Sequence, residues 1–292
     1  MSIDLHIHSE NSDGTESIKD IVEQSKNLQL EAISITDHEY LSKVPKDSGI
    51  KIISGVEVSA SWKKLETENK FAGIHLLMYF LDENSKLNLE LKEIREQKNL
   101  RNLEIIELLE KQNIFIDKSK FKNLKTKVPG RPHIAKAMVE QGYVDSVNEA
   151  FLNYLGNGKS SYVSTHQVSI NTLFELCKST KVLTFLAHPH TLMSNESFSK
   201  NENWINHKFK ELLLDLKKLG LNGIEAYYPG YNHATIDKLL KIANENNFLV
   251  SGGSDFHGSI KPNNYLGIGY ENNPLKIPKE VLSKLEEQYA KL

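Results

Sequence analysis

Hydrophobic and polar residues follow one another along this chain in short blocks that predict strands and helices in alternation. Apolar runs too short for a helix recur along the sequence, and each of them predicts a strand. Between them, apolar residues return at three- and four-residue spacing, as at Ile18, Ile21 and Val22, which predicts amphipathic helices. The predicted strands are residues 2–8, 32–38, 51–60, 71–81, 181–190, 221–229 and 247–258.

Nearly continuous apolar strands that alternate with amphipathic helices are typical of a mostly parallel sheet covered by helices on its outer face. The order of elements therefore predicts an α/β protein. A closed barrel and an open doubly wound sheet both fit the pattern, so it leaves these two architectures open.

The alternation breaks in the middle of the chain, where a long charged helix is followed by short helices and no strand. We interpret this stretch as a helical insertion that forms part of the substrate pocket. The helices are predicted over residues 88–111, 131–143 and 146–156, the insertion over 87–162, and the barrel over 1–86 and 163–292.

Composition narrows the class of protein and of partner. The 292 residues are 39% hydrophobic and 25% charged, which is ordinary for a soluble globular protein. A net charge of -2 argues against a broad electrostatic grip on long duplex nucleic acid. The single cysteine, Cys177, excludes an internal disulfide and a thiolate metal cluster. With no long apolar run and no signal-like N-terminus, we expect a cytoplasmic protein without membrane contact.

Histidine and acidic residues gather where the predicted strands end. His6 and His8 are two residues apart, so they point to the same side of the first strand. In parallel α/β barrels, reactive groups gather at the carboxyl ends of the strands. Nine groups follow this placement: His6, His8, Asp13, His38, Glu57, His75, His188, Asp255 and His257.

This clustering favours a metal site over buried structural histidines. Burying so many polar groups without partners would cost several kcal/mol. Imidazole and carboxylate ligands without thiolate suit manganese, zinc or iron, and nine ligands are too many for one ion. We therefore expect two to three divalent ions and favour manganese, with zinc or iron as alternatives. Clustered cations of this kind stabilise the charge that develops in phosphoryl transfer.

Taken in order, several motifs resemble those of the polymerase and histidinol phosphatase (PHP) superfamily. They are "DLHIHSENSDGT", "ISITDHE", "GVEVSA", "IHLLMYFLD", "LAHPH" and "SGGSDFHG". The stretch "GRPHIAKAMVEQGYV" resembles the helical insert of the branch that holds 3′,5′-nucleoside bisphosphate phosphatases and 5′-to-3′ exoribonucleases. The resemblance implies a distorted seven-stranded (βα) barrel that carries three metal ions.

The same resemblance implies how the nine ligands are shared among the ions, with Glu57 as a bridge between two of them. The Asp4 and Asp37 carboxylates are expected to orient ligand imidazoles through their second ring nitrogen. The implied ligand sets are His6, His8, Glu57 and Asp255 for the first ion; Asp13, His38 and His257 for the second; and Glu57, His75 and His188 for the third.

Substrate contacts are expected mainly from the insertion. Arg131 and His133 open a predicted helix, where a guanidinium and backbone N–H groups together suit a phosphate, and the resemblance implies this role. His233, between a strand and a helix, is taken as a further phosphate contact. Lys159 either reaches an anionic group or stays a solvated loop lysine. We expect Asp13, His257, Arg131 and His133 to act in catalysis.

These residues predict a metal-dependent phosphoesterase that acts on the ester at a ribose 3′-oxygen. The expected reaction converts a 3′,5′-nucleoside bisphosphate, such as adenosine 3′,5′-bisphosphate (pAp), to AMP and phosphate. Trimming of short 5′-phosphorylated RNA from its 5′ end breaks the same kind of ester. The alternatives are a histidinol-phosphate or general small-molecule phosphatase, and a non-catalytic PHP binding or proofreading module. We expect a monomer or a weak homo-oligomer.

Overall fold

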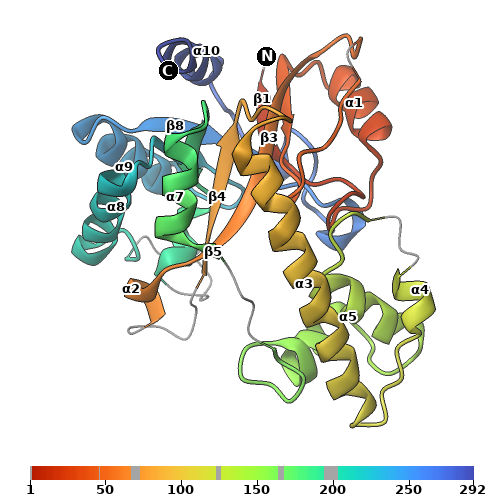
Figure 1. Ribbon diagram of the computed structural model, residues 1–292. Coiled ribbons are helices and arrows are strands. Elements are labelled where there is room, and N and C mark those ends of the chain that lie inside the picture. The colour runs from red at the N-terminus through yellow and green to blue at the C-terminus, as the bar shows by residue number, and fades with distance from the viewer. Residues whose placement is uncertain (1, 46, 67–72, 123–125, 164–167, 194–202) are drawn as a thin grey trace.

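One sheet organises the chain in this computed structural model, which describes residues 2–45, 47–66, 73–122, 126–163, 168–193 and 203–292 (Figure 1). The seven strands in spatial order are β1 (Ile3–Ile7), β2 (Ala32–Ile35), β3 (Lys51–Ser61), β4 (Gly73–Tyr79), β6 (Leu183–Leu186), β7 (Gly223–Tyr227) and β8 (Leu249–Gly252). A two-residue strand, β5 (Val168–Ser169), pairs with the end of β3.

The sheet curls until its first strand meets the segment that follows its last. Ile7 forms a parallel bridge with Phe256, and the His8 N–H donates to the Phe256 carbonyl at 2.9 Å. This closure confirms the distorted seven-stranded α/β barrel and excludes the open doubly wound alternative.

One strand runs against the others. β4 is antiparallel to both of its neighbours, β3 and β6, whereas the other adjacent pairs along the barrel are parallel. His75 therefore lies near the amino end of its strand, opposite Ser59 of β3. Because β4 is reversed, its amino end reaches the same rim of the barrel as the carboxyl ends of the parallel strands.

Apolar side chains fill the barrel and cover its outside. Leu5, Leu77 and Phe185 pack inside, against helix α10 (Glu280–Tyr289) at the end opposite the insertion (Figure 1). The outer face is covered by α1 (Ile18–Asn27), α7 (Ile170–Lys178), α8 (His207–Leu219) and α9 (His233–Glu245). Short elements complete this part: α2 (Lys63–Glu66), the 3-10 turns Pro189–Leu192 and Gly258–Ile260, and the hairpin β9 (Gly269–Tyr270) and β10 (Asn273–Pro274).

The insertion has an apolar core of its own. It is built from α3 (Lys86–Glu110), α4 (Lys118–Lys122), α5 (Arg131–Glu140), α6 (Val147–Ala150) and a π-helical turn over Phe151–Leu155. Its core includes Ile106, Met138 and Leu155, whereas Leu87 and Leu91 at the start of α3 belong to the barrel core. The proposed boundary at residue 87 thus falls inside a helix that serves both units, and the division stays a prediction.

The insertion also holds the loop that follows β1. The Lys127 and Val128 N–H groups donate to the Asn11 carbonyl at 2.8 and 3.1 Å, and the Thr126 hydroxyl donates to the Asn11 and Ser12 carbonyls. This clasp fixes the loop immediately before Asp13. None of the helices within the described residues is long and apolar enough to cross a membrane.

Candidate metal centre

The rim of the barrel brings the nine predicted side chains together. Three of them lie within strands: His6 in β1, Glu57 in β3 and His75 in β4. The others follow strands: His8 and Asp13 come after β1, His38 after β2, His188 after β6, and Asp255 and His257 after β8. Three groups have donor atoms that all lie within 4.8 Å of one another. They are His8, Asp13, His38 and His257; His6, His8 and Glu57; and His38, Glu57 and His75.

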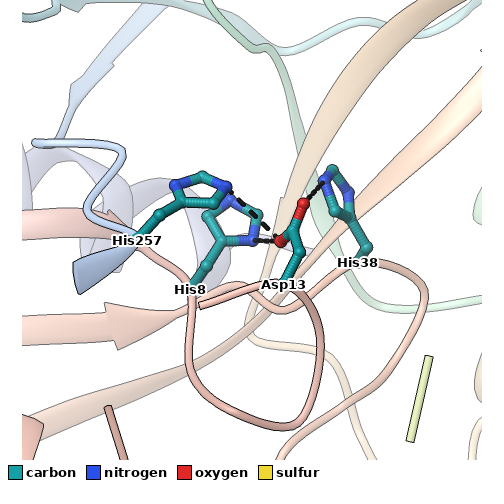
Figure 2. A group of neighbouring side chains, drawn as sticks. All are labelled: His8, Asp13, His38 and His257. Atoms are coloured by element: carbon teal, nitrogen blue, oxygen red, sulfur yellow. Dashed lines mark ion pairs between the residues drawn. The ribbon is translucent and has the colours of Figure 1, made fainter. Parts of the chain in front are cut away.

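Asp13 is the centre of the first group (Figure 2). Its Oδ1 lies 3.4 Å from His8 Nδ1 and 3.4 Å from His257 Nε2, and its Oδ2 lies 3.5 Å from His38 Nε2. The clasp from the insertion holds the loop that carries this carboxylate. The position of Asp13 therefore depends on both units of the fold.

Glu57 occupies the middle of the whole cluster, with only 1% of its side chain exposed. Its Oε1 lies 2.9 Å from His75 Nδ1 and 3.0 Å from His188 Nε2. Its Oε2 lies between 3.1 and 3.5 Å from ring nitrogens of His6, His8 and His38. One carboxylate thus faces two separate sets of imidazoles, as a bridging ligand must.

Asp255 presents its two oxygens to different partners. The Tyr228 hydroxyl and the Lys261 ammonium donate to Oδ2 at 2.7 and 2.6 Å. Oδ1 lies 3.4 to 3.5 Å from ring nitrogens of His6, His8 and His257. The first two contacts fix the carboxylate and leave Oδ1 directed at the imidazoles.

The spacing of these donor atoms fits divalent ions. Two ligands about 2.1 Å from one ion, at angles between tetrahedral and octahedral, lie about 3.0–3.4 Å apart. The nitrogen–oxygen distances above fall close to this range. Among the described residues, Asp13 Oδ1 and His38 Nδ1 are buried and have no hydrogen-bond partner. Metal ions would satisfy both atoms, so the donor set suits the metal cluster that the sequence predicts.

Electrostatics keeps most of the donor atoms in the form that binds cations. Burial lowers the pKa of His8 to about 3, and His257 acts in the same direction, so His8 stays neutral. Burial opposes ionisation of Asp13, but His38 and His257 outweigh it and hold its pKa well below the usual value. Burial lowers the pKa of His38 as well, yet Asp13 and Glu57 raise it to about 9.

Glu225 is a member of the site that the sequence analysis missed. This buried residue of β7 accepts a hydrogen bond from His6 Nδ1 at 2.8 Å and from the His188 backbone N–H at 2.6 Å. Burial lowers the pKa of His6, but Glu225, Asp255 and Glu57 raise it well above the usual value, so a bound ion must displace one proton. The bond to Glu225 then keeps the remaining proton on Nδ1 and leaves Nε2, on the side of His8, for the ion. A lone acid in the apolar strand "GIEAY" was the available signal, because a buried carboxylate needs a partner.

Replacing Glu225 with glutamine is expected to weaken metal binding by about 10- to 100-fold. A glutamine amide can accept only one of the two bonds, and its NH₂ would then face the other donor. Competition against a chromogenic chelator measures the affinity. Glu175→Gln is the control, because this exposed carboxylate of α7 pairs with Lys178 and lies outside the cluster: it should leave metal affinity unchanged. Equal affinity in wild-type and E225Q protein would refute this role.

The expected roles of Asp4 and Asp37 are wrong. Within the described residues, Asp4 accepts from the Ser254 hydroxyl and from backbone N–H groups, at 2.6 to 3.3 Å. Asp37 accepts from the hydroxyls of Ser9, Ser12 and Ser42 and from the Ser9 N–H. Both carboxylates fix the loops that carry the ligands, because these hydroxyl and amide donors take up their oxygens.

A cleft of about 190 Å³ opens next to Asp13, His38 and His75, and the insertion forms its other wall. Arg131 lines it and donates to the Leu155 carbonyl at 3.2 Å, and its guanidinium lies 5.8 Å from the Phe151 ring centre. Arg101 and Lys98 of α3 line the same wall. Burial and the neighbouring Arg131 lower the pKa of Arg101 to about 10, which still leaves the Arg101 guanidinium charged at neutral pH.

The other three predicted substrate residues lie in different surroundings. His133 is close enough to Asp13 for that carboxylate to act on its pKa, which burial lowers. His233 is exposed as the first residue of α9, and Lys159 is exposed in the loop after the π-helical turn. Neither makes a contact with the nine clustered side chains in the part of the chain that is described. The substrate roles of all three stay predictions.

Comparison with known proteins gives a consistent set of similarities. A family model of the PHP domain matches residues 4–250. A 5′-3′ exoribonuclease of Haemophilus influenzae is 28% identical over 261 residues, which is 87% of this chain and 89% of that protein. A 3′,5′-nucleoside bisphosphate phosphatase of Chromobacterium violaceum is 25% identical, over 88% of this chain and 87% of that one.

The fold also has counterparts among solved structures. A Chromobacterium violaceum protein described as an amidohydrolase with bound sulfate matches with a TM-score of 0.78 and 24% identity, over 99% of this chain and 97% of that one. At this identity the match supports the fold alone.

Proposed function

This chain belongs to the PHP domain family and is a metal-dependent hydrolase, and on that premise we propose that it cleaves the phosphate ester at the 3′-oxygen of a ribose. The favoured substrate is a small 3′,5′-nucleoside bisphosphate such as pAp, which would give AMP and phosphate. Both similar proteins described above are named for nucleotide or RNA phosphoesters, which supports this substrate class.

The main support for the proposal is the cleft itself, which has metal-ligating side chains on one wall and positively charged side chains on the other. His38 and His75 lie on one side of this cleft, and Arg131 and Arg101 lie on the other. A substrate with two phosphates fits such a cleft, because one phosphate can meet the metal cluster while the other meets the guanidinium groups. A mononucleotide with one phosphate would use only half of these contacts.

The nine clustered side chains would hold two to three divalent ions, for which manganese is favoured and zinc or iron are alternatives. When bound, such ions stabilise the charge that develops on the transferred phosphoryl group and supply an activated water. The proposed sets are those expected from the sequence, with Glu57 shared between two ions. Asp13 and His257 would act in catalysis by holding an ion beside the cleft.

The insertion supplies the proposed substrate contacts. The Leu155 carbonyl and the rings of Phe151 and Tyr162 hold the Arg131 guanidinium in place before substrate arrives, so little of its freedom is lost on binding. His133 Nδ1 accepts from the Gly130 N–H at 3.2 Å, so the neutral ring carries its proton on Nε2. His133 can thus donate that proton to a phosphate or departing ribose oxygen.

His233 and Lys159 are proposed as outer contacts with the substrate. Both are exposed, and neither has a fixed partner among the described residues that would restrict it. His233 begins α9, where the positive end of the helix adds to the attraction for an anion.

Phosphate release from pAp by manganese-loaded protein tests the proposal. The comparison substrates are 3′-AMP, AMP and histidinol phosphate. We expect fast release from pAp with AMP as the second product, slower release from 3′-AMP, and almost none from AMP. Preference for histidinol phosphate would instead favour the small-molecule phosphatase. Protein that binds no manganese and hydrolyses none of the four would favour a binding module, and the proposal would fail.

A further inference from the structure

A second cavity lies beside the same helix that lines the cleft. Its volume is about 890 Å³, and its wall includes Tyr40, Ser42, Asn84, Asn88 and Arg95, together with one more cation, Lys43, and one carboxylate, Glu83. Tyr40 and Ser42 belong to the segment that follows the ligand His38, and the two asparagines and Arg95 lie on α3 or just before it. The cavity therefore lies between α3 and the segment that leads away from the metal cluster after His38.

One side of α3 connects the two cavities. Arg95 lines the second cavity, whereas Lys98 and Arg101 line the cleft beside the metal centre. Residues spaced by three lie on neighbouring turns of the same helix face. Six residues of α-helix rise about 9 Å, so these cations form a short row that runs from the cleft into the second cavity.

Glu39, the residue after His38, connects this row of cations to the metal centre. Its carbonyl accepts from Arg95, and its buried carboxylate pairs with Lys98 and accepts from the Ser59 N–H at 2.9 Å. Glu39 thereby neutralises one charge of the row. Arg95 donates to the Glu39 carbonyl, and the Glu39 and Glu96 carboxylates act on its charge from further away.

Tyr40 and Arg95 form a stacked pair in the cavity wall. The Arg95 guanidinium lies 5.2 Å from the centre of the Tyr40 ring. Aromatic rings and guanidinium planes are the surfaces on which unpaired bases stack, and a row of cations follows the phosphates between the bases. The Asn84 amide adds a group that can hydrogen-bond a base edge, whereas Asn88 Nδ2 donates to the Glu83 carbonyl at 2.7 Å.

We propose that this second cavity binds the nucleotides that follow the scissile bond of a short single-stranded RNA. The first nucleotide would occupy the cleft, the connecting phosphates would pass along the row of cations on α3, and the next bases would stack on Tyr40 and Arg95. This inference rests on the proposed function, since it assumes that a ribose 3′-ester is bound at the metal centre. It gives the chain a place for an oligonucleotide that pAp does not need.

Tyr40→Ala tests the stacking surface through a comparison of two substrates. The KM for a 5′-phosphorylated tetranucleotide should rise about tenfold, whereas the KM for pAp should stay within about twofold of wild type. Tyr40→Phe keeps the ring and should keep the wild-type KM for both. Tyr270→Ala is the matched control, because Tyr270 is an exposed tyrosine on β9, away from this cavity.

Arg95→Gln tests the phosphate path through the salt dependence of binding. Affinity for a labelled hexanucleotide with a phosphorothioate first linkage should fall less steeply with salt. The log–log slope should become shallower by about 0.7 for each phosphate that no longer meets a cation. Lys111→Gln, at the exposed far end of α3, should leave the slope unchanged.

Two results would overturn the inference: Y40A and R95Q leaving oligonucleotide binding unchanged, or Y40A impairing pAp and the tetranucleotide equally. Failure of the proposed function is distinguishable, because it would appear as absent pAp hydrolysis in the wild-type protein. The phosphorothioate hexanucleotide would still report on the second cavity in that case.

Discussion

Glu57→Gln is expected to lower kcat/KM by about a thousandfold or more, because bound metal ions contribute several kcal/mol to stabilisation of the transition state. The carboxylate faces two sets of imidazoles with its two oxygens, at 2.9 Å from His75 and 3.1 Å from His8. Glutamine has nearly the same shape but loses the charge. Its NH₂ group would also point at ring nitrogens that must keep their lone pairs for metal. Both sets of ligands would lose affinity together.

Metal content per chain, measured by elemental analysis after manganese loading and desalting, separates this explanation from misfolding. E57Q should retain at least one ion fewer than wild type and keep a cooperative thermal transition. Glu175→Gln is again the control, since this exposed carboxylate lies outside the cluster and should not change the metal content. If E57Q keeps full occupancy and full turnover, Glu57 is not a bridging ligand.

Removing the divalent ions with a chelator should abolish turnover. The affinity of the metal-free protein for manganese should then increase as the pH is raised from 7 to about 9. In the metal-free protein His38 has a pKa of about 9, so at neutral pH it carries a proton. That proton must leave before the nitrogen can bind an ion. Apparent affinity should therefore increase by up to about tenfold per pH unit for this one proton. Burial lowers the pKa of His6, but Glu225, Asp255 and Glu57 raise it well above the usual value, so release of its proton adds to the rise.

Manganese affinity measured by chelator competition at pH 7, 8 and 9 checks this expectation. The stability of the metal-free protein should change in the opposite direction: a raised pKa stabilises the fold at low pH, and this contribution is lost as pH rises through 9. His38→Gln removes the titrating group and should flatten the rise in affinity. A flat profile for the wild-type protein would show that proton release from His38 does not accompany loading.

Much of the fold could be predicted because strand and helix periods are local properties of the sequence. The helix predicted over 88–111 is α3, Lys86–Glu110, and the Ser85 side chain caps its start by accepting from the Asn88 N–H. The strand predicted over 32–38 ends at Ile35, because Asp37 turns toward serine donors of a neighbouring loop. Residues 71–72 of the predicted strand 71–81 lie outside the described residues.

The reversal of β4 could not be predicted from the sequence. An apolar strand has the same pattern in either direction, so the alternation of elements suggested parallel pairing throughout. His75 still reaches the rim, since it is the third residue of a strand that runs in the opposite direction to its neighbours. The expected position of the ligand was right, but the reason given for it, the carboxyl end of a strand, does not apply to β4.

The site residues that could be predicted from the sequence are polar residues at the ends of apolar strands. Histidine at a strand end is rare enough to be noticed, which is why the nine clustered side chains could be named in advance. Lys98 and Arg101 lie in a helix where many charged residues face solvent, and only the fold reveals which of them line the cleft. Asp4 and Asp37 lie close to histidines in sequence, but only the fold shows that serine hydroxyls and backbone N–H groups of other segments take up their oxygens.

The reversed strand also determines where this protein can tolerate change. β4 ends at the side of the barrel away from the metal centre, and β6 begins at that same side. The connection between them therefore runs to the rim and back again. α3 runs to the rim and α7 runs back from it (Figure 1), and the described residues between them meet the barrel there through β5 and residues 126–128. Changes in length between these two helices need not alter a barrel strand, provided that residues 126–128, which hold the loop before Asp13, are kept. The fold thus combines a constant barrel with an exchangeable module, and new substrate preferences can arise in that module alone.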